Sequence, residues 1–280
     1  MPSEYLRFLK KESIVDVSLG DHVSKEMAVM FSDIRSFTSL SESMTPQENF
    51  DFVNAYLRQV SPAIRAHDGF IVKYLGDGMM AVFPEGVDDA IAAGLAKLNS
   101  VTAYNKKRIE EGFKPIAVGI GIHFGHMMVG MVGESARMQG DAFSDNVNLT
   151  ARLEGLTKQY GVSMIVSGQA LSVFSHAESY QIRFLDRVIV KGRSEAIDIY
   201  QMIDGESAAV QAQIEQTKAS FIAGIEHYRA GEFLSAKSCF DEVLRQVPTD
   251  KTAQIYCDRL SELMISPPEY WDGVWTLTEK

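Results

Sequence analysis

The chain has 280 residues, of which 46% are hydrophobic and 23% charged, with only 8 prolines. This composition is typical of an ordinary globular protein and excludes disordered and collagen-like chains. The 27 basic and 37 acidic residues give a formal net charge of −10. Such a balance disfavours a general nucleic-acid-binding surface, so any phosphate site must be local.

Cysteine usage and the lengths of the apolar runs indicate the environment. Cys239 and Cys257 are the two cysteines of the chain; they are too few for a disulfide framework and fit a reducing cytoplasm. No apolar run approaches the roughly 20 residues of a membrane span, and the charged start is too short for a signal peptide. We therefore expect a cytoplasmic chain, or the cytoplasmic part of a larger sensor protein.

The first 23 residues predict a linker or signalling segment, and a compact unit follows at 24–204. Its first apolar strand is expected at Met27–Phe31. Thr45-Pro46 then begins a helix, with threonine as the cap and proline in the first turn. That helix is expected to run to the stop at Asp68-Gly69.

The rest of the unit alternates strands and helices without a strict parallel repeat. Two hairpins are expected, at 70–83 around Gly76-Asp77-Gly78 and at 116–132. The other expected elements are helices at 88–111 and 146–160 and strands at 163–166, 182–190 and 196–202. This order predicts an α+β fold, a ferredoxin-like βαββαβ-type sandwich with a mostly antiparallel sheet.

Residues 205–280 predict a helical extension. Three amphipathic segments are broken by Gly231 and Pro248, and their spacing resembles one tetratricopeptide helix pair. A single repeat cannot bury its own apolar face, so the tail should pack on the preceding unit or on a second chain. Trp271 and Trp275 lie in the loop-like final stretch, which we expect to dock as an anchor.

Two acidic residues stand at turns beside apolar strands. Asp33 follows the first strand, and Asp77 lies at the tip of the first hairpin. If the two strands pair, both carboxylates emerge at the same end of the sheet and can share hard divalent cations. Taken alone, an Asp-Gly sequence more often fills a turn.

Two further segments carry groups that suit a nucleotide. Backbone N–H groups of the run Arg35-Ser36-Phe37-Thr38 can converge on a triphosphate, although its serine and threonine are more often local caps. Asn148 and Arg152 lie one turn apart on a helical face. They can orient a ribose and neutralise a transferring phosphoryl group, while an exposed polar helix face explains them equally well.

Three segments together resemble the class III nucleotide cyclase catalytic domain. They are Phe31–Glu42, Lys73–Ala81 and Asn146–Glu154. The three motifs occur in the order and at the spacing of that family, and the resemblance covers about Met27 to Met202. It is therefore far more specific than a lone glycine-rich loop.

The resemblance implies roles for individual residues. Asp33 and Asp77 would hold two Mg²⁺ or Mn²⁺ ions per active site, with the backbone carbonyl of Ile34 as a further ligand. Asn148 would hold the ribose and Arg152 would stabilise the pentavalent transition state.

The terminal phosphates would contact Lys191, which lies in the sequence Val188-Ile189-Val190-Lys191-Gly192. The alternative for this residue is an ordinary solvated lysine at a strand end. Phe37 and Thr38 belong to the segment that would surround the triphosphate.

The choice of base rests on two positions. Lys73 and Asp141 match the pair that reads adenine in adenylate cyclases, whereas guanylate cyclases carry Glu and a small residue there. An ammonium donates to the adenine ring, while a carboxylate accepts from the exocyclic amine. The resemblance thus implies an adenylate cyclase that converts ATP to 3′,5′-cyclic AMP and pyrophosphate.

Alternatives remain at this point. One is a guanylate cyclase, and another is a catalytically silent nucleotide-sensing or dimerisation module. A diguanylate cyclase fits less well, because its Gly-Gly-acidic-acidic-Phe signature is absent from the sequence.

The resemblance also implies an assembly. In this family the metal aspartates come from one protomer, and the base-reading lysine, the asparagine and the arginine come from the other. Because one chain holds both halves, a homodimer with two shared sites is expected. An upstream sensor domain or protein is a further expected partner.

Overall fold

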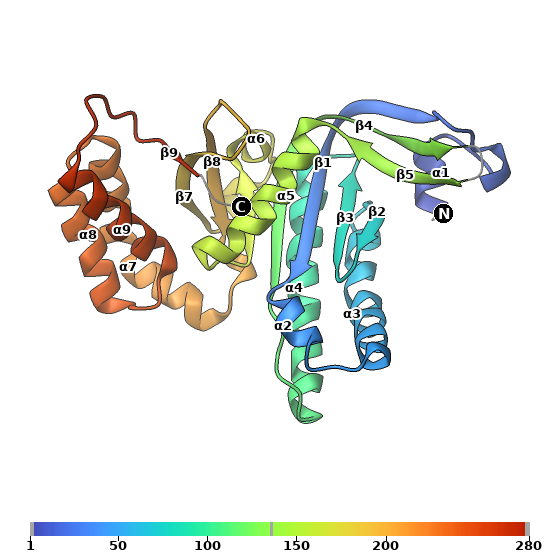
Figure 1. Ribbon diagram of the computed structural model, residues 1–280, viewed down its shortest axis with the longest axis horizontal. Helices are drawn as coiled ribbons and strands as arrows, with labels where there is room; N and C mark the ends of the chain where they lie inside the picture. Colours follow the sequence, from blue (N-terminus) through green and yellow to red (C-terminus); the bar gives the residue numbers. More distant parts are fainter. Residues whose placement is uncertain (1–2, 135–136, 278–280) are drawn as a thin grey trace.

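The computed structural model of the chain describes residues 3–134 and 137–277. Figure 1 shows a sheet with long helices on one side of the molecule and a group of three helices on the other. No helix in the described ranges combines the length and apolarity that crossing a bilayer requires.

Within the described residues the strands form a single nine-stranded sheet, in the order β2-β3-β1-β4-β6-β8-β7-β9, with β5 paired to β4. The strands are β1 (His22–Ile34), β2 (Phe70–Leu75), β3 (Gly78–Phe83), β4 (Val118–Glu134), β5 (Arg137–Phe143), β6 (Met164–Ser167), β7 (Ile182–Ile189), β8 (Ile197–Met202) and β9 (Trp275–Thr276).

The sheet is mixed, which corrects the expected mostly antiparallel arrangement. Strands β4 and β6 run parallel, and so do β7 and β9. The first of these pairings follows from the connection, because a helix between β5 and β6 returns the chain in the direction of β4. The second follows from the tail, which returns to β7 only after three helices.

The expected hairpin at 116–132 is wrong. Residues Val118–Glu134 form one continuous 17-residue strand, and Gly125 and His126 pair with Met27 and Glu26 of β1 instead of turning. The partner in the hairpin is β5, which pairs antiparallel with the far half of β4. We call this projecting pair, residues 128–134 and 137–143, the β4–β5 arm.

The long helices follow the sequence signals closely, whereas the short helices Phe37–Ser41 and Gly168–Leu171 were not predicted. Thr45 caps the helix that Pro46 begins, and its backbone N–H donates to the Glu48 carboxylate at 2.7 Å. The helices are α1 (Ser3–Phe8), α2 (Phe37–Ser41), α3 (Pro46–Ala66), α4 (Val87–Glu110), α5 (Asp145–Tyr160), α6 (Gly168–Leu171), α7 (Ala208–Arg229), α8 (Phe233–Gln246) and α9 (Lys251–Ile265). Short 3₁₀ turns lie at Ile14–Asp16, Ala177–Ser179 and Ile203–Gly205.

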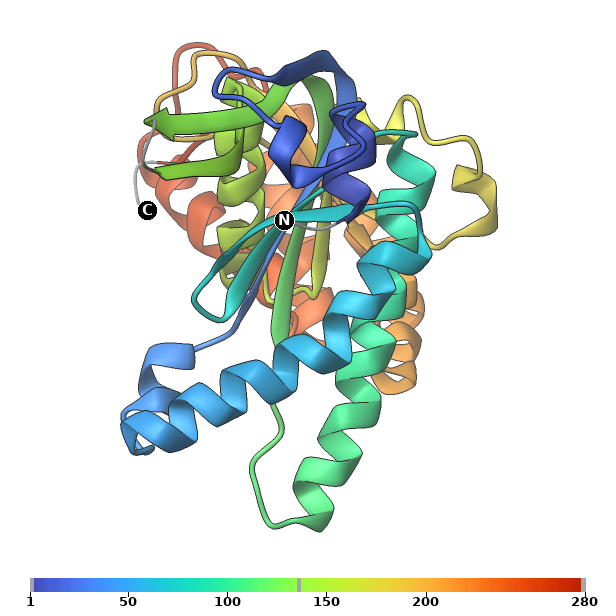
Figure 2. The same cartoon turned by 90° about the vertical axis from the view of Figure 1, so that its right-hand side faces the viewer.

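Alternate residues of β1 face two different cores. Ala28 and Met30 pack with α3 and α4, whereas Met27 and Val29 pack with the N-terminal segment. Figure 2 shows α3 and α4 extending past the ends of the strands. The N-terminal segment is therefore part of the hydrophobic core: Tyr5 is 1% exposed and Leu9 6%.

The tail has its own aromatic core, to which Phe221, Tyr228, Phe240 and Tyr256 contribute. Its final segment lies against these helices, as the indole N–H of Trp271 donates to the Tyr228 carbonyl at 2.7 Å. From there the chain reaches β9, which pairs with β7. The resemblance of the three helices to a tetratricopeptide pair stays a prediction.

A buried polar network joins the tail to the sheet and to α5. Arg259 donates to the Asp186 carboxylate at 2.5 Å, and these side chains are 5% and 1% exposed. Tyr160, the last residue of α5, donates to the same carboxylate at 2.5 Å. Tyr256 donates to the other carboxylate oxygen at 3.1 Å. The tail thus contacts the element that carries two of the predicted site residues.

Candidate active site

The two predicted metal-binding aspartates lie together. Strands β1 and β3 are antiparallel with Ser32 opposite Met79, so Asp33 at the end of β1 faces the turn that holds Asp77. The backbone N–H of Ile34 lies 3.1 Å from Oδ1 of Asp33 and 3.2 Å from Oδ2 of Asp77. Gly78 keeps this corner open, because a Cβ there would lie 3.1 Å from Oδ1 of Asp33.

The electrostatics of this corner favour a cation. Asp77 is 8% exposed, and burial together with the neighbouring Asp33 carboxyl raises its pKa to about 7. Two facing carboxylates supply the hard oxygen donors that Mg²⁺ and Mn²⁺ prefer. No cluster of three or more His, Cys, Asp or Glu side chains suited to a metal occurs in the described ranges. A carboxylate pair that leaves positions for water and phosphate fits Mg²⁺ well.

A buried lysine lies beneath the aspartates and was missed from the sequence. Lys97 of α4 is fully buried and hydrogen-bonds the Ser32 hydroxyl. Burial lowers its pKa to about 7, an effect that the charges of Asp33 and Glu154 oppose. A signal was present, because position 97 falls on the apolar face of the helix, beside Gly94 and Val101.

The predicted base-reading pair also lies together. The Lys73 ammonium donates to both oxygens of Asp141, at 2.7 and 2.8 Å. A bulge between Ile71 and Lys73 in β2 directs the lysine toward β5. Asp141 lies in β5 opposite Gly130 of β4, and the two side chains of the pair are 34% and 15% exposed.

Asn148 and Arg152 lie on α5, and the arginine is close to the loop of the predicted phosphate lysine. Asn148 is exposed and Arg152 half-buried. A Cβ at Gly192, the residue after Lys191, would lie 3.4 Å from Nη2 of Arg152. Nη1 of Arg152 is buried and has no hydrogen-bond partner among the described residues. A buried, unsatisfied guanidinium nitrogen fits an anionic ligand.

Glycines in β4 determine how closely α5 packs on the sheet. A Cβ at Gly121 would lie 2.4 Å from the backbone nitrogen of Glu154 and 2.7 Å from the Thr150 carbonyl oxygen. The backbone of α5 therefore touches the strand where no side chain intervenes. This contact determines where the helix presents Asn148 and Arg152.

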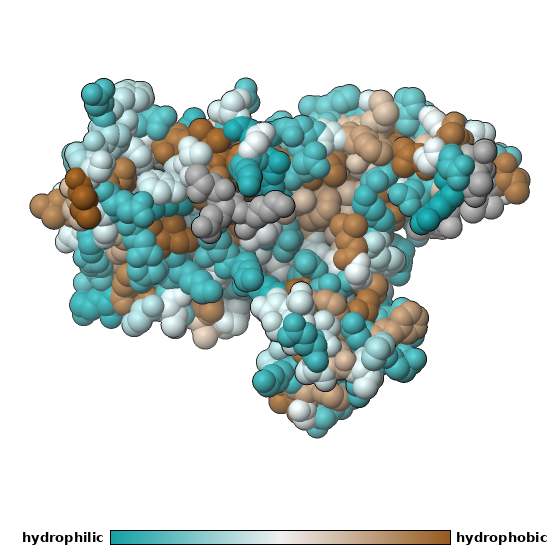
Figure 3. All heavy atoms as spheres, in the orientation of Figure 1, coloured by the Kyte–Doolittle hydropathy of each residue, from teal (hydrophilic) through white to brown (hydrophobic). Residues whose placement is uncertain are grey.

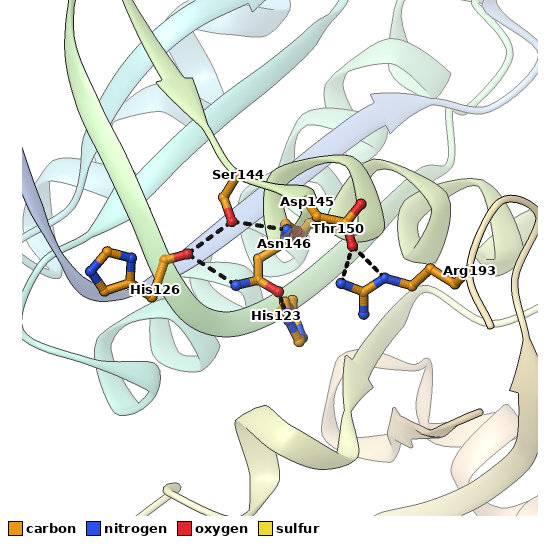
Figure 4. A network of polar contacts seen from close by, with 7 residues as sticks. All are labelled: His123, His126, Ser144, Asp145, Asn146, Thr150 and Arg193. Carbon is orange, nitrogen blue, oxygen red and sulfur yellow. Dashed lines mark hydrogen bonds and ion pairs between the residues drawn. The ribbon is translucent and has the colours of Figure 1, made fainter. Parts of the chain in front are cut away.

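A polar network holds the first turn of α5 (Figure 4). His123 contacts the Ser167 hydroxyl at 2.7 Å and the Asn146 side-chain oxygen at 3.2 Å. The Asn146 amide and the Ser144 hydroxyl both donate to the His126 carbonyl, at 3.0 and 2.8 Å. Burial lowers the pKa of His123 to about 4, so this imidazole is neutral at physiological pH.

The predicted triphosphate segment is only partly available to a ligand. The Phe37 ring packs on the core and stacks on Phe52 with 6.1 Å between centroids. Thr38 is exposed. Any contact of Phe37 with a phosphate would therefore use its backbone N–H.

The predicted site residues form three separate groups on one chain. Asp33 and Asp77 form the first, Lys73 and Asp141 the second, and the α5 residues with the Lys191 loop the third. In the part of the chain that the structure describes, no hydrogen bond or ion pair links the first group to either of the others.

Comparison with known proteins places the chain in a family. Residues 21–204 match the model of the adenylate and guanylate cyclase catalytic domain. The chain is 36% identical over 208 residues to an adenylate cyclase of Anabaena cylindrica, covering 72% of this chain and 41% of that protein. It is 32% identical over 265 residues to the terminal-differentiation-specific adenylate cyclase of Dictyostelium discoideum, covering 92% of this chain and 12% of that protein.

Solved structures agree with the sequence relatives. A bacterial light-regulated adenylyl cyclase is 27% identical with a TM-score of 0.60, covering 70% of this chain and 56% of that one. The adenylyl cyclase CyaB from P. aeruginosa is 29% identical with a TM-score of 0.56, covering 65% of this chain and 95% of that one. The chain spans less than half the length of the two sequence relatives above. By sequence and by fold, it belongs to the family of adenylate and guanylate cyclase catalytic domains.

Proposed function

We propose that this chain converts ATP to 3′,5′-cyclic AMP and pyrophosphate, at two equivalent sites shared between two copies. The observation that carries the proposal is the pair of facing carboxylates of Asp33 and Asp77, bridged by the Ile34 N–H. Burial and the neighbouring Asp33 carboxyl raise the pKa of Asp77, and a divalent cation bound between the two carboxylates would offset their repulsion. A divalent ion is thus the natural occupant.

Asp33, Asp77 and the Ile34 carbonyl hold two Mg²⁺ or Mn²⁺ ions in this proposal. When bound, such ions lower the pKa of the ribose 3′-hydroxyl and neutralise the triphosphate. Gly78 leaves room beside the carboxylates, and the backbone N–H groups of Phe37 and Thr38 lie in the segment that follows β1.

In this proposal the residues of α5 act on the nucleotide. Asn148, which is exposed, orients the ribose, and Arg152, whose buried Nη1 has no partner among the described residues, stabilises the transferring phosphoryl group. Lys191 binds the terminal phosphates, since its loop borders Arg152. The two cationic side chains would thus lie where negative charge develops in the reaction.

A second copy completes each site. The aspartates have no polar link to Lys73, Asn148 or Arg152 within the described chain. In a dimer, the aspartates of one protomer can lie beside the base-reading pair and the α5 residues of its partner, which completes the site. The β4–β5 arm exposes Met128, Met138 and Phe143 at 41–51%, and Figure 3 shows hydrophobic residues among hydrophilic ones over the end of the molecule that holds the arm. An exposed apolar surface of this kind suits an interface.

Adenine is the base that we assign to the pair of Lys73 and Asp141. The Lys73 ammonium donates to a ring nitrogen of adenine, and the Asp141 carboxylate accepts from its exocyclic amine. Their mutual contacts at 2.7 and 2.8 Å place the two groups side by side, and in this proposal adenine would bind to both. Guanine presents the reversed donor and acceptor pattern at these edges and would meet like groups.

The relatives also bear on regulation. Because the matched relatives are much longer than this chain, we include an upstream sensor domain or protein in the proposal. The N-terminal segment, which lies against the sheet, is the element through which such an input would act.

The test is an assay of the purified chain with Mn²⁺ and ATP or GTP across protein concentration. We expect cyclic AMP to exceed cyclic GMP, and the specific activity to rise with concentration as dimers form. Absence of any cyclic nucleotide would refute the proposal and favour a silent nucleotide-sensing module. Equal or greater turnover of GTP would refute the adenine assignment alone.

Complementation tests the sharing of sites. Asp33→Ala and Arg152→Ala should each be inactive. Mixing them should restore about a quarter of the wild-type activity, because half of a random population is mixed dimer and each mixed dimer holds one intact site. Mixed chains that stay inactive would show that each chain works alone.

A further inference from the structure

A tyrosine from the N-terminal helix lies directly behind the Lys73–Asp141 pair. Tyr5 of α1 is 1% exposed, and its hydroxyl donates to the Gly130 carbonyl at 2.9 Å. Gly130 is the β4 residue that stands opposite Asp141 in the β4–β5 pairing. The hydroxyl is therefore held at the β4 position directly opposite the residue of β5 that carries the carboxylate.

The ring of Tyr5 also occupies space that β5 leaves for it. A Cβ at Gly140 would lie 2.7 Å from the ring carbon Cζ of Tyr5, so a side chain at that position would force the ring or the strand to shift. Gly140 directly precedes Asp141 in β5. The ring thus presses on the backbone next to the carboxylate.

The same ring contacts the strand of the lysine. Tyr5 meets Phe70 edge to face, with 5.2 Å between ring centroids. Phe70 begins β2, three residues before Lys73 and just before the bulge that directs that lysine. One side chain therefore contacts both strands that supply the base-reading groups.

The charge environment keeps the hydroxyl a donor. Burial, reinforced by the negative charge of Asp141, raises the pKa of Tyr5 to about 12, while a hydrogen bond from the Asp141 backbone opposes this shift. The hydroxyl is thus protonated at any physiological pH. Its donation to the Gly130 carbonyl is constant, so the contact works as a fixed support.

We propose that Tyr5 is a positioning residue for substrate specificity, which sets the preference for adenine by holding Lys73 and Asp141 in register. This inference rests on the proposed cyclase function. Two groups that read a base must be held within about half an ångström of the productive geometry by residues around them. Tyr5 contacts β2, β4 and β5 at once and so meets this requirement.

The variant Tyr5→Phe removes the hydroxyl and keeps the ring. We expect the ratio of kcat/KM for ATP over GTP to fall about fivefold, the effect of losing one ordinary buried hydrogen bond. The change should appear as a higher KM for ATP, with kcat altered less than about twofold. Gly140→Ala tests the same contact from the strand, and its added methyl should lower the ratio in the same direction.

Leu9→Ala is the matched control. Leu9 is 6% exposed and belongs to the same apolar cluster as Tyr5, but the three atoms nearest to a Cβ at Gly140 all belong to Tyr5. This variant should lower the unfolding temperature and leave the ATP/GTP ratio unchanged. The comparison separates loss of positioning from general loss of stability.

The outcomes are distinguishable. A wild-type chain that forms no cyclic nucleotide refutes the proposed function itself. An active wild type whose ATP/GTP ratio stays constant in both Tyr5→Phe and Gly140→Ala overturns the role of Tyr5. A ratio that falls as far in Leu9→Ala as in Tyr5→Phe also overturns it, because the effect would then be one of stability. If Tyr5→Phe does not fold, Gly140→Ala alone decides.

Discussion

Replacing Arg259 by methionine tests how firmly the tail is joined to the catalytic unit. The change leaves the Asp186 carboxylate, 1% exposed, without its cation. Removing one partner of a buried ion pair costs about 3–5 kcal/mol. The hydroxyls of Tyr160 and Tyr256 still donate to this carboxylate, at 2.5 and 3.1 Å, so we expect the lower end, about 3 kcal/mol.

The assay is urea unfolding of the wild type, Arg259→Met, Asp186→Asn and the double variant. Because each single change leaves a buried group unpaired, the double variant should lose less than the sum of the two. Arg245→Met is the exposed control: Arg245 pairs with Glu242 at 2.6 Å on the surface of α8, and a surface pair contributes about 0–1 kcal/mol. A loss below about 1 kcal/mol for Arg259→Met, or strict additivity in the double variant, would refute the reasoning.

Three further changes test the site. Lys73→Glu combined with Asp141→Cys should move the kcat/KM preference toward GTP by at least about tenfold, because donor and acceptor are exchanged; an unchanged preference would contradict the assignment. His123 takes up its proton near pH 4 when folded and near 6.5 when unfolded, so stability falls as the pH falls between these values. In urea unfolding, the free energy of unfolding should fall between pH 7 and pH 4.5 by about 2 kcal/mol less for His123→Gln than for the wild type. Equal losses in the two proteins would argue against this role of His123. Gly121→Ala should lower the free energy of unfolding by about 1–3 kcal/mol and lower kcat, because the added methyl displaces α5. At Gly155 an added Cβ would meet open space, so Gly155→Ala should change neither quantity. Thermal unfolding and turnover assays measure both.

Local signals predicted those parts of the fold that local chemistry determines. The helix at Thr45-Pro46 has the expected cap, and the hairpin around Gly76-Asp77-Gly78 forms because a glycine with φ of 69° makes the turn. The meeting of Asp33 and Asp77 followed from the pairing of two apolar strands.

Long-range packing determines what the sequence did not predict. Glycine is typical of a turn, yet Gly125 is extended and pairs with Met27 of β1. A Cβ at this position would lie 2.4 Å from the side-chain nitrogen of Asn146, which explains the glycine. Strand β5 is rich in polar residues and gave no apolar alternation, since most of its side chains are exposed or half-exposed. Lys97 was missed because a charged residue is assigned to the surface by default, whereas here a serine hydroxyl and an aromatic ring enclose it.

The two-residue strand β9 has a consequence for how this chain behaves in solution. Without it, the last two residues of β7 would also lie at an open edge, where their free N–H and C=O groups could pair with another molecule. Trp275 and Thr276 pair with Val188 and Ile189, and the Leu277 N–H donates to the Ile189 carbonyl at 2.9 Å. A fragment ending at residue 204 would expose this edge together with Phe184, which now lies against the tail. We expect such a fragment to self-associate by strand addition more readily than the full chain.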